Sequence, residues 1–183
     1  MLSTLLSLSA LLVSTSLAQY PPAYLTASDV FGTTCTTCGM IGAFPTGPKT
    51  NVAILTNDTS KALTGQFDDS YWTFNGFNAT HSLHMSPTAD NPAFPHYGSV
   101  GINPGFDTDG FSEGDEDGLL VWNNTDMANE GSFFAVCPTV IPGYEAAGVQ
   151  DRVFWQSNEA PAEGTVNCTT IVLHGAFEGA QEE

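Results

Sequence analysis

Short hydrophobic runs separated by turn residues dominate this chain. No window keeps apolar residues at i, i+3, i+4 and i+7 over three turns, the pattern that an amphipathic helix requires. Several short strands joined by Gly- and Pro-rich turns are typical of antiparallel sandwiches and barrels. We therefore predict an all-β fold, an antiparallel β-sandwich or barrel-like domain with long Gly/Pro loops. The expected strands cover residues 51–56, 71–75, 80–85, 119–122, 132–137, 152–156 and 169–174.

Two stretches depart from simple alternation of apolar and polar residues. In 71–77, aromatic residues occupy both alternating sets of positions, so we expect a strand that is covered on both sides. Segment 86–118 holds four Pro and six Gly, and only residues 98–102 read as a strand. We predict that the rest of it is a long loop or a set of turns, where function tends to concentrate.

The N-terminus has the composition of a secretory leader. Residues 2–17 are apolar or small and carry no charge, and they end in Ser16-Leu17-Ala18, a small-x-small cleavage pattern. We expect a signal peptide over 1–18 and a single exported domain over 19–183. A buried N-terminal helix is the alternative. No later apolar run reaches 18 residues, so we expect no membrane span.

The charge balance excludes one class of partner. The chain has 3 Lys+Arg against 20 Asp+Glu, for a formal net charge of −17. Nucleic-acid recognition needs a basic face, which three cations cannot make. Docking on anionic lipid is disfavoured for the same reason.

Sequons and cysteines both agree with export. The sequence N-x-[ST] occurs at Asn57, Asn78, Asn123 and Asn167, and we expect at least one of these to carry a surface glycan.

The four cysteines are expected to form two disulfides in an oxidising compartment. Cys137 and Cys168 are 31 residues apart at the ends of two expected strands. Cys35 and Cys38 either bond to each other or tie the N-terminal segment to the C-terminal strands. A redox C-x-x-C lacks the helix that would activate its thiol, and a zinc site lacks a second C-x-x-C.

The C-terminal third resembles an uncharacterised family of small secreted cysteine-containing fungal proteins. The shared features are the aromatic-x-Val-Cys strand at 133–137, the Trp-bearing strand at 153–155, Pro161, Cys168 and a last strand at 172–177. Members of that family also have two N-terminal cysteines, but in this chain the corresponding pair, Cys35 and Cys38, lies unusually close together. The resemblance implies an exported, disulfide-bonded β-protein. That family has no assigned activity, so no site residues carry over.

The densest local feature is an acidic run at 107–117, with six carboxylates in eleven residues. Ca²⁺ prefers six to eight oxygen ligands on a turning backbone, but the spacing of an EF-hand is absent. A solvated acidic loop is the favoured interpretation, and a Ca²⁺ site is the alternative. The candidate ligands are Asp107, Asp109, Glu113, Asp115 and Asp117.

Other chemistry is weakly indicated. The G-x-S-x-G pattern at 110–114 lacks the strand-then-helix context of a nucleophile elbow, so a serine hydrolase using Ser112 is a minor alternative. His81 and His84 point to opposite faces of any strand, and a metal site that includes His96 is a further minor alternative.

The three tryptophans lie in expected strands, and we assign them to the core rather than to a sugar-stacking surface. They are Trp72, Trp122 and Trp155.

Together these features predict a secreted, glycosylated, acidic monomer that is extracellular or associated with a cell wall. We expect an interaction or effector-like role without catalysis and without a cofactor, and a partner that is a cell-wall polysaccharide or a host or extracellular protein. A polysaccharide- or Ca²⁺-binding module is the alternative.

Overall fold

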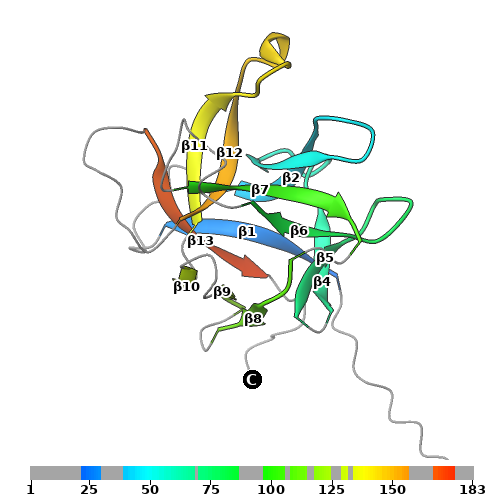
Figure 1. The fold of residues 1–183 in the computed structure, drawn as a ribbon, viewed down its shortest axis with the longest axis vertical. Coiled ribbons are helices and arrows are strands. Elements are labelled where there is room, and N and C mark those ends of the chain that lie inside the picture. Colours follow the sequence, from blue (N-terminus) through cyan, green and yellow to red (C-terminus); the bar gives the residue numbers. More distant parts are fainter. Residues whose placement is uncertain are drawn as a thin grey trace, which may run out of the picture.

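The chain is built almost entirely from antiparallel β-strands (Figure 1). The computed structural model describes residues 22–29, 39–68, 70–86, 97–105, 108–114, 118–124, 129–131, 134–156 and 167–175. In these ranges one short 3₁₀ helix, η3 (Glu145–Ala147), accompanies the strands, and no helix there is long and apolar enough to cross a membrane. The strands are β1 (Ala23–Asp29), β2 (Gly39–Pro45), β3 (Asn51–Thr56), β4 (Thr64–Asp68), β5 (Tyr71–Phe74), β6 (His81–Met85), β7 (Tyr97–Pro104), β8 (Phe111–Glu113), β9 (Leu120–Asn124), β10 (Asn129–Gly131), β11 (Phe134–Val140), β12 (Val149–Gln156) and β13 (Thr169–Gly175).

Ten strands form one large sheet that closes on itself. Eight of them pair in the order β1–β4–β5–β6–β7–β12–β11–β13, and β13 pairs back with β1. The hairpin β2–β3 bridges this ring, because β2 pairs with β1 while β3 pairs with β12 and β7. Closure satisfies backbone groups that an open sheet would leave unpaired at its edges.

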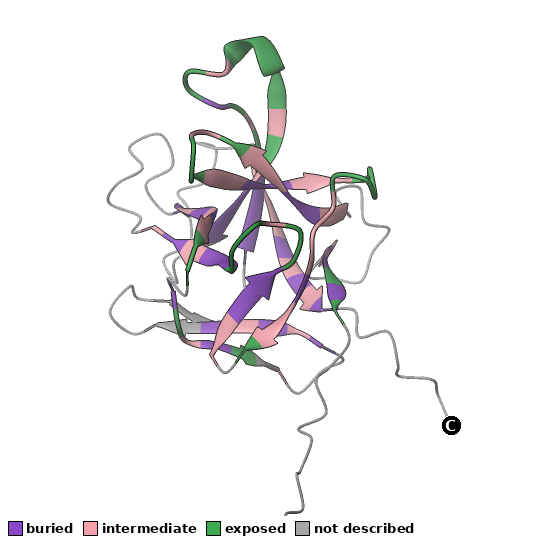
Figure 2. Cartoon of the chain, turned by 90° about the vertical axis from the view of Figure 1, so that its right-hand side faces the viewer, coloured by how far each residue is buried: buried purple, intermediate pink, exposed green. Residues whose placement is uncertain are grey.

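A smaller sheet of β8, β9 and β10 packs on the core of the large one. Phe111 and Trp122 from the small sheet are buried in the same cluster as Trp155 of β12. The Trp122 and Trp155 rings meet edge to face with their centroids 5.2 Å apart. Figure 2 shows the buried residues gathered inside and the exposed residues concentrated toward the end of the β11–β12 hairpin.

The expected strands are all present, and the prediction that the tryptophans belong to the core is confirmed. Trp72, Trp122 and Trp155 are each 0% exposed. β13 alternates buried and half-buried residues as a strand with one covered face should, and β7 does so over most of its length.

Two expectations about loops need correction. The strand predicted at 98–102 is present within β7, but the prediction that the rest of 86–118 is irregular is wrong in part, because this segment also contains β8. Gly98, which weakens a strand signal, is required in β7: a Cβ there would collide with the indole of Trp155 and the carbonyl of Ser86. The strand expected over 71–75 ends at Phe74, and Phe77, which the alternation over 71–77 placed on one of its faces, lies in the loop that follows.

Candidate binding groove

Two hairpin loops form the walls of an open groove. One is the turn at 46–50 between β2 and β3, and the other is the loop at 75–80 between β5 and β6. The groove has a volume of about 570 Å³. Its described lining residues are Pro45, Gly47, Pro48, Lys49, Asn51, Phe77, Asn78, Ala79, His81 and Pro104.

The first wall is a tight turn held by its own hydrogen bonds. The backbone N–H of Thr46 donates to the carbonyl of Thr50 at 2.9 Å, and the Thr46 hydroxyl donates to the same oxygen at 3.2 Å. A Cβ at Gly47 would lie 2.6 Å from Oγ1 of Thr50, so this position favours glycine. The turn therefore presents Pro48 and Lys49 on a constrained backbone.

The second wall reverses direction at Gly76, whose φ of 93° lies in the region that only glycine adopts easily. This reversal places Phe77 beside the first residue of β6. The Phe77 ring is stacked on the imidazole of His81, with centroids 3.9 Å apart and an angle of 16° between the planes. The stack fixes the aromatic side chain of this loop.

A hydrogen bond sets the orientation of His81. Its Nδ1 lies 2.9 Å from the carbonyl oxygen of Ala79. Because a carbonyl can only accept, Nδ1 carries the proton and donates it to the Ala79 carbonyl. His81 is 9% exposed, so the imidazole is largely built into the floor of the groove.

The floor is further fixed from the neighbouring strand. Nδ2 of Asn51 donates to the carbonyl of Ile102 at 3.0 Å, across the β3–β7 pairing. Pro104 of β7 lies opposite His81 in the register. Strand residues thus hold the floor, while the two loops supply the walls.

The groove differs in charge from the rest of the protein. Lys49 is the one charged residue among its described lining residues, although the chain carries −17 overall. The other two cations are engaged elsewhere. Lys61 pairs with Asp58 at 3.5 Å, and the half-buried guanidinium of Arg152 lies 4.8 Å from the centre of the Phe154 ring. Within the described part of the chain, Lys49 has no ion-pair partner.

Arg152 belongs to the outer face of the sheet and not to this groove. Its Nη2 donates to Oγ of Ser99 at 3.4 Å, and burial lowers its pKa from the ordinary value. On the same face, burial raises the pKa of the Tyr97 phenol.

A smaller hollow of about 240 Å³ adjoins the groove on the other side of the 75–80 loop. Phe77 and Ala79 line both hollows, and the smaller one also includes Asp68 and Thr80. The 75–80 loop therefore separates the two hollows and lines both of them.

The structure describes only part of the acidic run at 107–117, the candidate Ca²⁺ site. Of its five candidate ligands, Asp107, Asp115 and Asp117 lie outside the described residues. Asp109 is exposed, and Glu113 ends β8, though its side chain is not described. Among described residues no three His, Cys, Asp or Glu side chains come together as metal ligands.

The G-x-S-x-G pattern at 110–114 does not lie at a turn between a strand and a helix. Ser112 is the central residue of β8 and pairs with Val121 of β9. A nucleophile elbow needs a sharp turn between a strand and a helix, and Ser112 instead lies in regular strand. The prediction that this pattern lacks the context of a nucleophile elbow is therefore confirmed.

The two histidines of β6 lie on opposite faces of the strand, as their spacing predicts. His81 and His84 both lie in β6, three residues apart, and so point to opposite faces. His81 lines the groove, while His96 lies outside the described residues.

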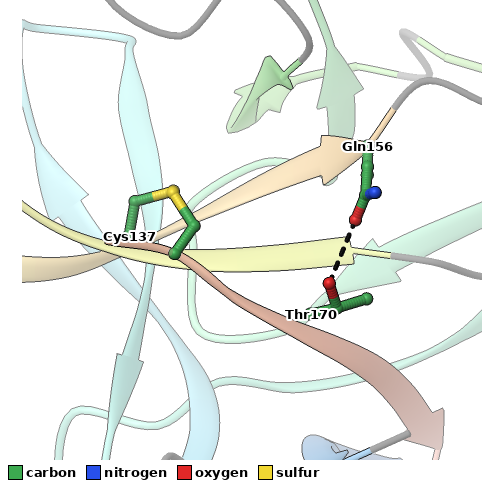
Figure 3. The surroundings of a disulfide bond; sticks show 4 residues. Cys137, Gln156 and Thr170 are labelled. Carbon is green, nitrogen blue, oxygen red and sulfur yellow. Dashed lines mark hydrogen bonds between the residues drawn. A yellow bond between two sulfur atoms is a disulfide. The ribbon is translucent and has the colours of Figure 1, made fainter. Parts of the chain in front are cut away.

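One of the two expected disulfides is present (Figure 3). Cys137 of β11 is bonded to Cys168, just before β13. Close by, the hydroxyl of Thr170 donates to Oε1 of Gln156 at 3.2 Å and ties β13 to β12. Cys35 and Cys38 lie outside the described residues.

The sequons lie in different settings. Asn57 is exposed after β3, Asn78 is exposed in the groove wall, and Asn167 is exposed beside Cys168. Asn123 lies in β9, and its side chain is not described.

Sequence reasoning missed the groove because its walls come from segments separated by about thirty residues. The signals that could have pointed to it are the turn residues at 45–48 and the sequence Asn75-Gly-Phe-Asn78, where an aromatic residue adjoins a turn and a sequon. Neither signal specifies that the two loops meet.

A family model described as a domain of unknown function (DUF7907) matches residues 39–177. The matched region runs from β2 past the end of β13, so it includes both groove loops and the disulfide. No curated protein and no solved structure matches the chain.

Proposed function

We propose that this chain, which belongs to the DUF7907 family, is a secreted binding protein that holds a short stretch of neutral saccharide in the groove between the 46–50 and 75–80 loops. Its site of action is the extracellular space or a cell wall, and it acts as a monomer without catalysis. The leader-like segment 1–18 and the Cys137–Cys168 disulfide support export.

The composition of the groove carries the proposal. Sugar rings present flat C–H faces surrounded by hydroxyls, and they bind where aromatic and aliphatic carbon lies beside fixed polar groups. The groove combines the carbon surface of three prolines and Phe77 with the polar side chains of Lys49 and Asn78. Because the Phe77–His81 stack already holds the ring, little conformational entropy is lost when a sugar binds against it.

Charge favours a neutral saccharide over an anionic one. A net charge of −17 repels anions at long range, and Lys49 alone does not reverse that field. None of the described lining residues is a carboxylate, so the groove has no direct attraction for a cation. Hydroxyl groups can hydrogen-bond to the Lys49 ammonium without meeting this repulsion.

The test uses protein from the oxidising bacterial periplasm, where disulfides form and no N-glycan is added. A neutral-oligosaccharide array identifies the best probe, and calorimetry then measures its affinity for three variants. We expect Phe77→Ala to weaken binding about tenfold, equivalent to about 1.4 kcal/mol. Lys49→Ala should weaken it less, through loss of hydrogen bonds to hydroxyls.

Lys61→Ala is the matched control, since Lys61 is exposed and pairs with Asp58 outside the groove. Unchanged affinity in this variant is the expected result. An array without any bound neutral saccharide, or a Phe77→Ala protein that binds as well as wild type, would overturn the proposal.

A further inference from the structure

We propose that Asn78 carries an N-linked glycan whose first sugars dock in the groove, and that this glycan controls access of other saccharides to it. The control of access rests on the proposed function, whereas the docking of the chain's own glycan does not. The occupant is thus a saccharide covalently attached at the wall of the site.

The position of the sequon carries the inference. Asn78 is exposed and lines the groove between Phe77 and Ala79, which line it as well. Thr80, the other essential residue of the sequon, is also exposed, and its backbone carbonyl accepts a hydrogen bond from Gly105 N–H at 2.8 Å. A sugar attached to Nδ2 of Asn78 therefore begins at the groove that Phe77 and His81 also line.

The covalent step uses a lipid pyrophosphate-linked oligosaccharide as donor. The bond between C1 of the first sugar and the pyrophosphate oxygen breaks, and a bond between C1 and Nδ2 of Asn78 forms. The amide loses one proton, and the lipid pyrophosphate leaves. The product carries an N-acetylglucosamine whose amide and hydroxyl groups are neutral, like the ligand that the groove's charge favours.

Attachment makes the groove's own glycan a strong competitor. A ligand on a short tether has an effective concentration on the order of millimolar. A shallow, open groove that binds a free sugar weakly would therefore be filled by a sugar already linked to its wall. Removal of the glycan would open the groove to other saccharides.

The chain supplies a matched control in its other exposed sequon. Asn57 follows β3, carries the same N-x-[ST] pattern, and is not among the described lining residues of the groove. A glycan there adds the same mass and hydration without reaching Phe77. Any effect specific to Asn78 must then come from its position.

The experiment compares wild type with Asn78→Gln, Thr80→Ala and Asn57→Gln, all secreted from a eukaryotic host. Glycopeptide mass spectrometry measures occupancy at Asn78, and hydrogen exchange measures protection of the 75–81 amides. Calorimetry measures affinity for di-N-acetylchitobiose, a probe with the chemistry of the glycan core. Thr80→Ala removes the sequon while keeping the Asn78 side chain, so it separates loss of the glycan from loss of the amide.

We expect Asn78 to be occupied, and both sequon variants to lose protection at 75–81 and to bind chitobiose about tenfold more tightly than wild type. Asn57→Gln should match wild type in both measurements. An unoccupied Asn78, or equal protection with and without its glycan, overturns the docking. Equal chitobiose affinity in glycosylated and unglycosylated protein overturns the control of access.

Failure of the proposed function gives a different result. If chitobiose and the array sugars bind to no form of the protein, while the Asn78 glycan still protects 75–81, external saccharide binding is wrong and the docked glycan stands. Phe77→Ala then provides a second check, because in this background glycosylated protein and the Thr80→Ala variant should show equal exchange at 75–81. Protection that persists without the Phe77 ring would contradict the docking geometry.

Discussion

The ring of Phe77 lies parallel to the imidazole of His81, with the two centroids 3.9 Å apart. His81 is in turn fixed by the hydrogen bond from Nδ1 to the Ala79 carbonyl at 2.9 Å. One strand residue therefore anchors a loop at two points, through its ring face and through its ring nitrogen. This arrangement turns the 75–80 loop into a defined wall.

Removing the anchor should loosen the loop without unfolding the sheet. We expect His81→Ala to increase hydrogen exchange of the 75–80 amides and to lower the free energy of unfolding by about 1–3 kcal/mol, since the stack and the Ala79 hydrogen bond are lost together. Exchange mass spectrometry and urea unfolding measure the two effects. His84→Ala, on the opposite face of the same strand, should leave exchange of the loop unchanged.

The disulfide should contribute substantially to stability. Cys137–Cys168 closes a 31-residue separation, and the loop-entropy estimate for such a bridge is about 3–4 kcal/mol. We expect the Cys137→Ser/Cys168→Ser double variant to show a correspondingly lower urea midpoint. A double variant with wild-type stability would mean that the hydrogen bond between Thr170 and Gln156 and the β11–β13 pairing already hold this corner.

Gly98 should tolerate no side chain. A Cβ there would collide with the Trp155 indole and the Ser86 carbonyl, which are joined by a hydrogen bond of 2.7 Å. We expect Gly98→Ala to destabilise the protein by about 2–4 kcal/mol, because the core must shift or lose that bond. Gly101→Ala in the same strand is the comparison, since its Cβ would lie 3.2 Å from the Asn51 carbonyl, a tight contact that a small shift relieves, and thermal unfolding should place it nearer to wild type than Gly98→Ala.

The stability of the protein at alkaline pH should depend on ionisation of the buried Tyr97 phenol. Burial raises its pKa above the ordinary value of 10.0, so the folded state holds the proton more tightly than the unfolded state. The stability from this difference is complete below pH 10 and is lost as pH rises through the raised pKa. Melting temperatures from pH 9 to 11.5 should fall less steeply in Tyr97→Phe than in wild type. Parallel curves would contradict the assignment.

The interpretation of 107–117 as a solvated loop is wrong in part, because the run contains strand β8 with its buried Phe111, but we still expect its carboxylates to bind no Ca²⁺. A ligand that binds the folded state raises stability by RT ln(1 + [L]/Kd), so even a weak Ca²⁺ site would be visible at millimolar Ca²⁺. We expect no heat in calorimetry and no thermal shift beyond that of Mg²⁺ at equal ionic strength. A shift specific to Ca²⁺ that disappears in an Asp107→Asn/Asp109→Asn variant would establish the alternative.

Local pattern was enough to identify the class of the fold. Each of the seven expected runs of aromatic and β-branched residues is a strand, because period-two alternation and the positions of Gly and Pro can be read from the sequence. The strands that were not predicted have a weak local signal; β8, for example, lies within the acidic run. The strand predicted at 98–102 is present as the middle of β7, although its two glycines weaken the pattern.

The sequence by itself therefore determined the β character, the charge, the sequons and the cysteines, since each is a property of neighbouring residues. Only the tertiary structure decided that the sheet closes through β1–β4 and β11–β12, and that Cys137 meets Cys168. It also decided that the turn carrying Lys49 faces the loop carrying Phe77 and Asn78. These relationships depend on strand order and register, which are set by the burial of all strands together and not by any one segment.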